Sequence, residues 1–357
     1  RAIAAVFAAG LLVGILTHGA LSDLFSRTTL YIFVPALIFE AAWHLKIPEL
    51  RRHWLAVTLL AGPGVPLTAA IVAFFAVAIA HVTIGDALLL GSILAATDPI
   101  AVVAVFRRLH VPRELVAIVE SESLFNDAVA VVLYRATLAW LAIGAAAQPT
   151  AHVILVSLFG SLGSLAIGAL LGRMVGGIAT RITITGCALL VSVVGAFGVY
   201  ALCDALRWSG IFAVIAFAAM MRSTEGLGDH RRIELDRAWH RIALFANAAL
   251  FFLMGAALDF SRFALVPVLV AATLLGVFVA RVLLAYGLLA AVRLPSTWRN
   301  VVRVAGMRGA LSLALALAIP SEIAGRGAIE MATFAVVVVT VLTGTLTLEP
   351  RLRKAEF

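Results

Sequence analysis

Three acidic residues lie inside apolar stretches of this sequence, where acids are rare. Asp98 belongs to one stretch, and Glu122 and Asp127 belong to the next. A carboxylate at the depth of a lipid bilayer costs several kcal/mol unless it is paired or serves a function. These three residues therefore mark the candidate functional site.

The first acid, Asp98, stands beside a predicted helix break. Pro99 has no backbone N–H, and its ring disfavours the helical conformation in the residue before it. The helix should therefore break at Thr97, Asp98 and Pro99. Inside a membrane, the backbone groups freed by such a break must be buried in protein or face water.

Four polar residues of the second stretch share one helix face. Glu122 and Asn126 are four residues apart, and so are Ser123 and Asp127, a spacing that brings side chains together on a helix. Acid, hydroxyl and amide groups then converge opposite the break at Asp98. Such an oxygen-rich pocket suits a small hard cation, or protons that compete for the same oxygens.

The composition indicates that membrane-spanning helices hold this site. The chain has 357 residues, of which 63% are hydrophobic and 13% are charged, about half the charged fraction of a soluble domain. The formal net charge of +8 could suggest nucleic-acid binding, but the basic residues lie in short loops between apolar stretches. Basic residues in such loops orient a protein in the bilayer, so no nucleic-acid partner is expected.

Twelve apolar stretches approach the length that crosses a bilayer, which takes roughly 20 residues. They cover about residues 2–20, 28–45, 54–81, 85–106, 114–147, 150–172, 182–204, 208–221, 237–258, 262–292, 298–319 and 326–348. Residues 222–236 are predicted to form a connecting loop or a helix at the membrane surface. Because the sequence starts at Arg1 without an initiator Met, we expect one further helix upstream, which makes thirteen in the full protein.

The basic residues predict how these helices are oriented. Nineteen Lys and Arg residues follow even-numbered stretches, and four follow odd-numbered ones. Because cytoplasmic loops carry the excess of Lys and Arg, the ends of the even-numbered helices and the C-terminus are predicted to be cytoplasmic. We expect an integral protein of the cell (inner) membrane.

A second special segment, GMRGALSLALALAIP, carries an arginine at membrane depth, Arg308. Gly306 and Gly309 allow close backbone approach or local unwinding beside it. A buried Arg needs an acidic or polar partner, and the candidates are Glu122 and Asn126. The three stretches around Asp98 and the three around Arg308 start on opposite sides of the membrane, as inverted repeats require.

Five motifs occur in an order and spacing that resemble a known family. They are LIFEAAWHL, TDPIAVVAVFRRL, ESLFNDAVAVVL, FFLMGAALD and GMRGALSLALALAIP. Together they resemble the NhaP-type sodium/proton antiporters, the electroneutral branch of the monovalent cation/proton antiporters. The pairing of TDP with ESLFND is the most specific feature, since the electrogenic branch carries Asp-Asp where this chain carries Asn126 and Asp127.

The resemblance implies an all-α polytopic membrane protein that forms a homodimer. It would exchange one Na+ or Li+ for one H+, as a secondary transporter rather than an enzyme and without a cofactor. A core of inverted repeats with two broken crossing helices, about residues 54–147 and 262–348, would move against a dimerisation domain formed by the remainder. The cation ligands would be Asp127, Asp98, Ser123, the backbone carbonyl of Thr97, and Glu40. A structural polar cluster would comprise Glu122, Asn126 and Arg308.

Single residues allow other interpretations. Asp127 could form a structural ion pair with a buried Arg, and Asp98 could cap a half-helix. Glu122 fits a structural partner of Arg308 better than a ligand, and Glu40 lies close enough to a helix end to reach water. The eight histidines show no metal-ligand spacing, although one of them could modulate a response to pH.

Three other functions are compatible with parts of the pattern. One is a K+/H+ antiporter of the same fold. Another is a passive cation channel, which would not need carboxylates that are neutralised in each cycle. The third is an intramembrane aspartyl protease, which also needs two carboxylates on neighbouring helices. In this chain, however, Asp98 precedes Pro and Asp127 follows Asn, instead of standing in a Gly-x-Gly-Asp setting.

Overall fold

The computed structural model describes residues 2–17, 28–109, 111–143, 151–257, 266–292 and 294–354. Within these ranges the regular structure is entirely helical, without a strand, which confirms the predicted all-α fold. The helices divide into two compact units.

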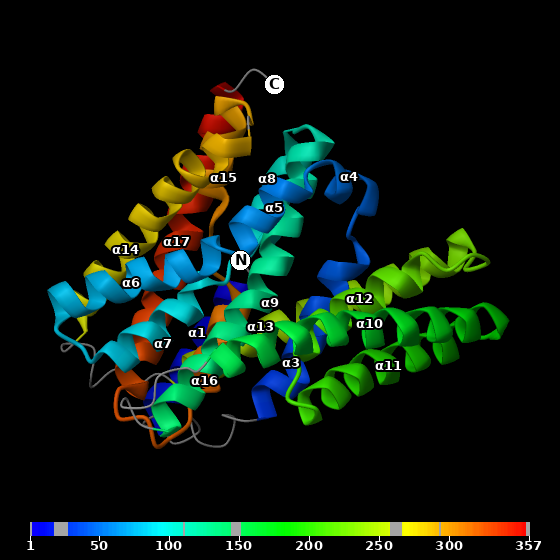
Figure 1. Ribbon diagram of the computed structural model, residues 1–357, viewed down its shortest axis with the longest axis horizontal. Coiled ribbons are helices and arrows are strands. Elements are labelled where there is room, and N and C mark those ends of the chain that lie inside the picture. The colour runs from blue at the N-terminus through cyan, green and yellow to red at the C-terminus, as the bar shows by residue number, and fades with distance from the viewer. Residues whose placement is uncertain are drawn as a thin grey trace. The chain divides into compact units, whose positions relative to one another are not determined.

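The first unit comprises residues 1–26, 46–147 and 251–357 and contains most of the helices in Figure 1. These helices are α1 (Ala2–Thr17), α4 (Ile47–Arg52), α5 (Trp54–Ala61), α6 (Gly64–Ala80), α7 (Ile84–Ala95), α8 (Ile100–Arg108), α9 (Arg113–Ile143), α14 (Pro267–Tyr286), the 3-10 helix η2 (Leu288–Val292), α15 (Ser296–Ala305), α16 (Ala310–Leu317) and α17 (Arg326–Lys354).

The second unit comprises residues 27–45 and 148–250. Its helices are α3 (Thr28–Trp43), α10 (Ala151–Arg181), α11 (Thr185–Ala205), α12 (Gly210–Arg222) and α13 (Asp229–Ala257), the last of which continues into the first unit. Helix α12 packs against α3, α10 and α11. Glycines make its contact with α10 close, because Gly168 and Gly172 of α10 lie against the backbone of α12 with no room for a Cβ atom.

Most predicted apolar stretches are single helices, but four are interrupted, one of them 262–292, which changes from α14 to the 3-10 helix η2 at Gly287. Seven helices of the described residues are long and apolar enough to cross a membrane, and three shorter apolar helices accompany them. The stretch 85–106 is broken at residues 96–99, and 298–319 is broken at residues 306–309. The stretch 54–81 is divided into α5 and α6 at Gly62 and Pro63.

The start of α13 differs from the prediction. Residues 222–236 were predicted to be a loop or a surface helix, but the chain is helical from Asp229, so α13 joins much of this polar segment to the apolar stretch after it. Polar residues at the start of α13 therefore belong to the same rigid element as its apolar part. The predicted ends at residues 18–20, 144–147 and 262–265 lie outside the described residues.

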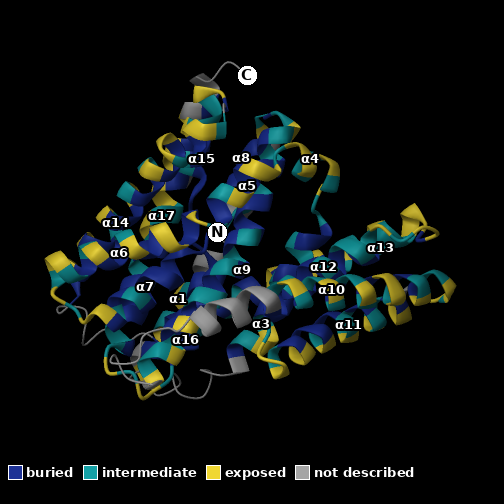
Figure 2. Ribbon diagram, in the orientation of Figure 1, coloured by how far each residue is buried: buried dark blue, intermediate teal, exposed yellow. Residues whose placement is uncertain are grey.

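Other helices of the first unit pack closely around α7 and α16, the two short helices that adjoin the breaks. Helix α6 packs against α7 and α14 (Figure 1), with Gly91 of α7 touching the Ala69 carbonyl of α6. All eight residues of α16 are buried, and α7 is buried along most of its length (Figure 2). The α7–α8 and α15–α16 breaks are thus enclosed by other helices, as the membrane requires of irregular backbone.

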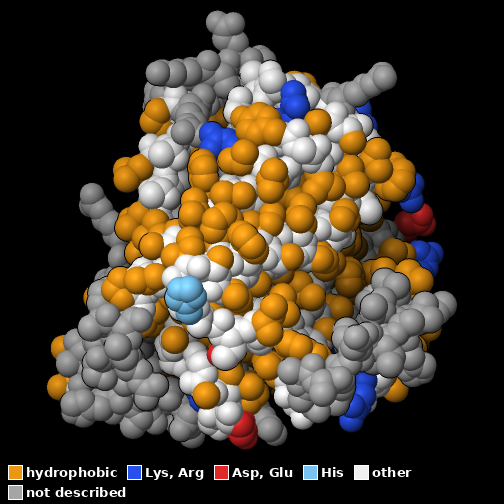
Figure 3. Space-filling view, turned by 60° about the vertical axis from the view of Figure 1, so that its left-hand side comes forward, with side chains coloured by type: hydrophobic (Ala, Val, Ile, Leu, Met, Phe, Trp, Pro, Cys, Tyr) orange, Lys and Arg blue, Asp and Glu red, His pale blue; other side chains and the backbone are white. Residues whose placement is uncertain are grey.

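The outer surface of the helices suits a lipid environment. Large apolar side chains such as Phe74 and Phe278 in the first unit and Leu170 in the second are more than half exposed. One face, seen in Figure 3, carries mostly hydrophobic side chains and few charged ones. A surface of this kind is stable against lipid, while charged side chains such as those of Glu122, Arg281 and Arg308 are buried inside the protein, away from the lipid.

Candidate cation site

The two broken segments, residues 96–99 and 306–309, contact each other directly. The backbone N–H of Asp98 donates to the carbonyl of Met307 at 2.8 Å. One turn before the first break, the Ile93 carbonyl accepts a hydrogen bond of 2.9 Å from the Ser312 hydroxyl of α16. Each break therefore satisfies backbone groups that the other leaves free.

The charged side chains at the breaks match the helix ends that they face. Arg308 Nη1 donates to the carbonyls of Ala95 and Ala96 at 2.9 and 3.0 Å, at the C-terminal end of α7, where a cation is favoured. Asp98 precedes the N-terminus of α8, and its carboxylate contacts Gly309 at the N-terminus of α16. A carboxylate at helix N-termini is likewise stabilised.

Two glycines permit this close approach. A side chain at Gly309 would overlap the Asp98 carboxylate, and one at Gly306 would overlap the Arg281 guanidinium. The two glycines therefore make room for charged side chains, and the chain is unwound between them, which is one of the two roles predicted for Gly306 and Gly309.

Helix α9 adds the remaining polar groups of the site. The Ser123 hydroxyl donates to the Thr97 carbonyl at 2.5 Å, and Asn126 Nδ2 donates to the Thr97 hydroxyl at 3.2 Å. Asp127 is close enough to Asp98 for the two carboxylates to repel each other when both are ionised. The structure thus brings together Thr97 and Asp98 of the α7–α8 break with Ser123, Asn126 and Asp127 of α9.

Oxygen atoms remain free at this point. Asp127 Oδ1 and Asn126 Oδ1 are inaccessible to solvent, and neither has a hydrogen-bond partner among the described residues. Both are acceptors in the ionised acid and the amide. Buried acceptors without donors fit a hard cation or a proton. Within the described part of the chain there is no group of three or more His, Cys, Asp or Glu residues arranged to hold a metal ion, so a cation would use hydroxyl and carbonyl oxygens beside the two acids.

The partner of Glu122 differs from the one we expected. Glu122 Oε1 accepts a hydrogen bond of 2.5 Å from Arg281 Nη1, whereas the side-chain hydrogen bonds of Arg308 go to the α7 carbonyls. Direct pairing of Arg308 with Glu122 or Asn126 is therefore wrong in this structure. Arg308 lies within the α15–α16 break, so its guanidinium reaches the carbonyls at the end of α7. Helix α14 places Arg281 beside Glu122.

Arg281 is the residue that the sequence pattern did not assign. It was recognisable as an arginine at membrane depth, yet nothing in the sequence indicated its partner 159 positions away. Glu122, Arg281 and Arg308 are all at least 95% buried. Glu122 and Arg308 still interact electrostatically without a direct bond.

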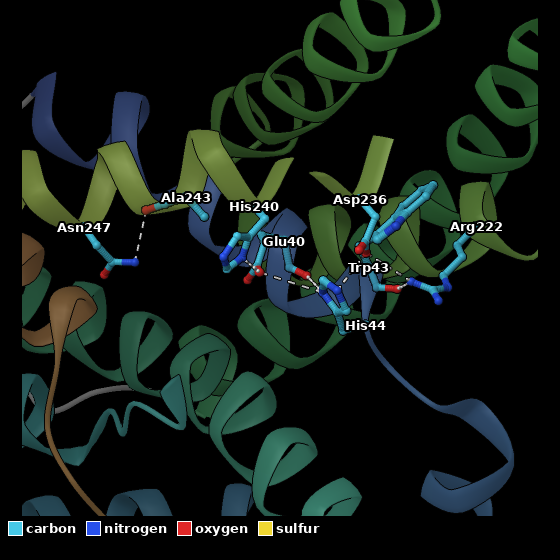
Figure 4. A network of polar contacts seen from close by, with 8 residues as sticks. All are labelled: Glu40, Trp43, His44, Arg222, Asp236, His240, Ala243 and Asn247. Carbon is cyan, nitrogen blue, oxygen red and sulfur yellow. Dashed lines mark hydrogen bonds and ion pairs between the residues drawn. The ribbon is translucent and has the colours of Figure 1, made fainter. Parts of the chain in front are cut away.

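Glu40 lies in the second unit, on α3. Its Oε1 is 3.1 Å from His240 Nδ1 of α13 (Figure 4), and His44 is a further neighbour at 3.9 Å. All other predicted ligands belong to the first unit. The participation of Glu40 in the cation site therefore stays a prediction.

Comparison with known proteins gives the family. A model of the family described as sodium/hydrogen exchanger, transmembrane, matches residues 2–354. The chain belongs to this family. The sequence-based resemblance to NhaP-type antiporters is thereby confirmed as a family assignment.

Several curated relatives carry the name of an antiporter. A Na+/H+ antiporter of Aphanothece halophytica is 31% identical over 345 residues, which cover 94% of this chain and 66% of the relative. The Na+/H+ antiporter NhaP of Pseudomonas aeruginosa is 30% identical over 348 residues, covering 92% of this chain and 81% of the relative. The chain spans about two thirds of the length of the first of these relatives.

A solved antiporter structure has the same fold. The structure of the sodium proton antiporter MjNhaP1 from Methanocaldococcus jannaschii at pH 8 superposes with a TM-score of 0.85 at 21% identity, covering 99% of this chain and 92% of that one. This likeness shows that the broken-helix architecture of this chain is the fold of that antiporter.

Proposed function

We propose that the protein exchanges Na+ or Li+ for H+ across a cell membrane. The observation that carries this proposal is the pair of acids, Asp98 and Asp127, beside the Thr97 carbonyl and the point where two broken helices meet. Hard oxygen ligands of this kind bind small cations, and the same acids bind protons. The names of the relatives support Na+ and H+ as the two substrates.

The cation ligands in this proposal are Asp98, Asp127, Ser123 and the Thr97 carbonyl, all of the first unit. Ser123 donates its only proton to the Thr97 carbonyl, which leaves the hydroxyl lone pairs to face a cation. Asn126 donates a hydrogen bond from its side-chain amide to the Thr97 hydroxyl. We assign Asn126, Glu122 and Arg308 to the support of these ligands, with the free Asn126 Oδ1 as a further acceptor beside them.

The number of charges supports an exchange of one cation for one proton. Three buried or half-buried acids, Asp98, Glu122 and Asp127, accompany two buried arginines, Arg281 and Arg308. With all five ionised, the cluster carries one negative charge more than positive. Either one Na+ or one H+ neutralises it, and a neutral cluster is the form that moves through a low-dielectric environment at the lowest cost.

Binding of either substrate then permits the change in access. Because cation and proton exclude each other at one site, alternating exposure of that site to the two sides couples their fluxes without a separate proton pathway. The first unit contains the predicted core, residues 54–147 and 262–348. The second unit would serve dimerisation, in a homodimer whose C-termini are cytoplasmic.

The function is tested in sealed proteoliposomes that contain a pH-sensitive dye. An inward Na+ gradient should drive H+ out of vesicles made with the parent chain, and Asp127→Asn should abolish this flux. The matched control is Asp229→Asn, because Asp229 is an acid with a 93% exposed side chain at the start of α13. Flux that persists in Asp127→Asn, or Na+ entry without proton exit, would contradict the proposal. The second outcome would indicate a channel.

A further inference from the structure

A second buried polar cluster lies in the first unit, between α9 and α17. Its members are Tyr134 of α9 and Arg326, Glu330 and Thr333 of α17, and we call them the tyrosine cluster. The three α17 residues are spaced four and three positions apart, so they share one face of that helix. Tyr134 is close enough to Arg326 and Glu330 for their charges to act on its hydroxyl. The cluster therefore joins side chains of two helices.

The tyrosine cluster is separate from the cation site. Tyr134 stands seven residues after Asp127 on α9, which is about 10 Å along the helix axis. Ala130 and Val131, both buried and apolar, occupy the turn between them. No member of the cluster is one of the proposed cation ligands, so its burial needs an explanation of its own.

The charged members of the cluster form a buried ion pair. Arg326 Nε donates to Glu330 Oε1 at 2.7 Å, and the two residues are only 8% and 5% exposed. Two further charges of opposite sign lie nearby, since Arg135 acts on the tyrosine hydroxyl and the Asp86 carboxylate contacts Gly325. With all four ionised, these charges cancel. A neutral polar ligand is therefore favoured here over an ion.

Two buried hydroxyls accompany the ion pair. Tyr134 Oη and Thr333 Oγ1 are inaccessible to solvent, and neither has a hydrogen-bond partner among the described residues. Other buried threonines differ, because Thr68, Thr137 and Thr273 each donate to a carbonyl four residues earlier on their own helix. A buried hydroxyl without a partner is destabilising. These two hydroxyls thus indicate a ligand that can both donate and accept hydrogen bonds.

We propose that the tyrosine cluster binds water between α9 and α17. Water is neutral, donates and accepts, and is held in protein interiors by about two to four polar partners. The hydroxyls of Tyr134 and Thr333 and the Arg326–Glu330 pair supply this number. Bridging water joins polar groups almost as well as a direct hydrogen bond does, so it fastens α17 to the helix that carries Asp127.

This inference does not depend on the proposed function. It concerns a second polar site of the first unit, and its tests measure water and stability rather than transport. A chain that exchanged no Na+ for H+ would still answer both of them.

The first experiment detects water at Tyr134 directly. X-ray pulses convert water beside a side chain into hydroxyl radicals, and mass spectrometry then measures the oxidation of each residue in the detergent-solubilised protein. The matched control is Tyr200, which is equally buried, at 2% exposure against 1% for Tyr134, and whose ring packs edge-on against Tyr31. Tyr134 should be oxidised several times faster than Tyr200. Equally slow oxidation of the two residues would overturn the water site.

The second experiment uses the sign of a change in melting temperature. Tyr134→Phe keeps the ring and removes only the hydroxyl. If the hydroxyl bonds to water, its loss should lower the melting temperature by about 1 to 3 °C. If the hydroxyl has no partner at all, its loss removes a destabilising group. An unchanged or higher melting temperature in Tyr134→Phe would therefore overturn the proposal.

A double-mutant cycle tests whether the water bridges the two helices. Thr333→Val should also lower the melting temperature, and the double variant with Tyr134→Phe should lose less than the sum of the two single losses, because both hydroxyls hold the same water. The matched control is Thr273→Val, whose hydroxyl bonds to carbonyls of its own helix and whose effect should add to that of Tyr134→Phe. Full additivity of Tyr134→Phe and Thr333→Val would overturn the bridge between α9 and α17.

Discussion

At the scale of residues, the groups that we propose as cation ligands are distinct from the groups that hold the helices together. Asp98, Asp127 and Ser123 surround the Thr97 carbonyl, whereas Arg281 and Arg308 have carboxylate and backbone partners of their own. The two sets should therefore respond in opposite ways to substitution, because removing a ligand relieves repulsion and removing an ion-pair partner leaves a charge buried.

Arg281→Ala tests the structural set. It leaves Glu122 as a buried acid without its partner, a loss of about 3 to 5 kcal/mol in soluble proteins. Arg308→Ala should also be destabilising, because it leaves the Ala95 and Ala96 carbonyls without a donor. Both variants should melt well below the parent, and Arg241→Ala, at an exposed position of α13, should not. An Arg281→Ala variant as stable as the parent would show that the Glu122 contact does not support the fold.

Asp127→Asn tests the ligand set. It should abolish exchange and keep or raise the melting temperature, because two neighbouring carboxylates no longer repel each other. Added Na+ should raise the melting temperature of the parent by linkage, but not that of Asp127→Asn. If Asp127→Asn melted below Arg308→Ala and kept its response to Na+, the roles of these two residues would have to be exchanged.

Ser123→Ala should have an intermediate effect. It deletes one neutral oxygen and a hydrogen bond to the Thr97 carbonyl, so the apparent affinity for Na+ should fall while the melting temperature changes little. The affinity is measured from the Na+ dependence of exchange. An unchanged affinity would exclude Ser123 as a ligand.

Much of this site was predictable because it is local in sequence. Thr97, Asp98, Ser123, Asn126 and Asp127 lie within 31 positions. Proline chemistry predicts the break at Asp98, and helical spacing predicts the shared polar face of α9. Partners that are distant in the chain were not predictable. Arg281 and Arg308 compete for the same acid, and the outcome depends on where α14 and the α15–α16 break lie, which no local pattern encodes. Glu40 and His240 are likewise in contact although they are 200 positions apart in the sequence.

At the scale of elements, the site depends on two helix breaks of different origin. Pro99 forces the first one, as the sequence predicts. The second occurs at Gly306 and Gly309. Glycine permits unwinding without requiring it, and the side chains of Asp98 and Arg281 occupy the space that the two glycines leave. The break in 298–319 agrees with the local unwinding that Gly306 and Gly309 were expected to allow. Helix α13 extends beyond its apolar stretch because helical propensity in the polar residues before that stretch does not require burial.

Gly309→Ala tests the contact between the breaks. The added methyl overlaps the Asp98 carboxylate, so either Asp98 or the start of α16 must move. We expect loss of most exchange activity and a lower melting temperature. The matched control is Gly198→Ala in α11, where a Cβ meets nothing within 4 Å and where alanine favours the helix. Full activity in Gly309→Ala would mean that the two breaks need not touch.

At the scale of the whole molecule, the charge of the cluster decides whether transport is electrically silent. Glu122 is paired with Arg281 in the structure, and Asn126 adds no charge. Under the proposed mechanism, one Na+ would replace one H+, and the net charge moved would be zero. On a supported membrane at symmetric pH, a Na+ gradient should therefore produce proton flux without a current. A steady current of the sign of Na+ would show that more charge moves in one direction than in the other.

The central claim is that Na+ and H+ occupy one carboxylate site and exclude each other. Its most direct test is Na+ binding to the detergent-solubilised protein by calorimetry, in buffers of different ionisation enthalpy and at several pH values. The claim predicts that the affinity for Na+ weakens as the pH falls, with about one proton released for each Na+ bound where the site is protonated, and that Asp127→Asn shows neither Na+ binding nor proton release. A Na+ affinity that is independent of pH, with no proton release, would contradict it.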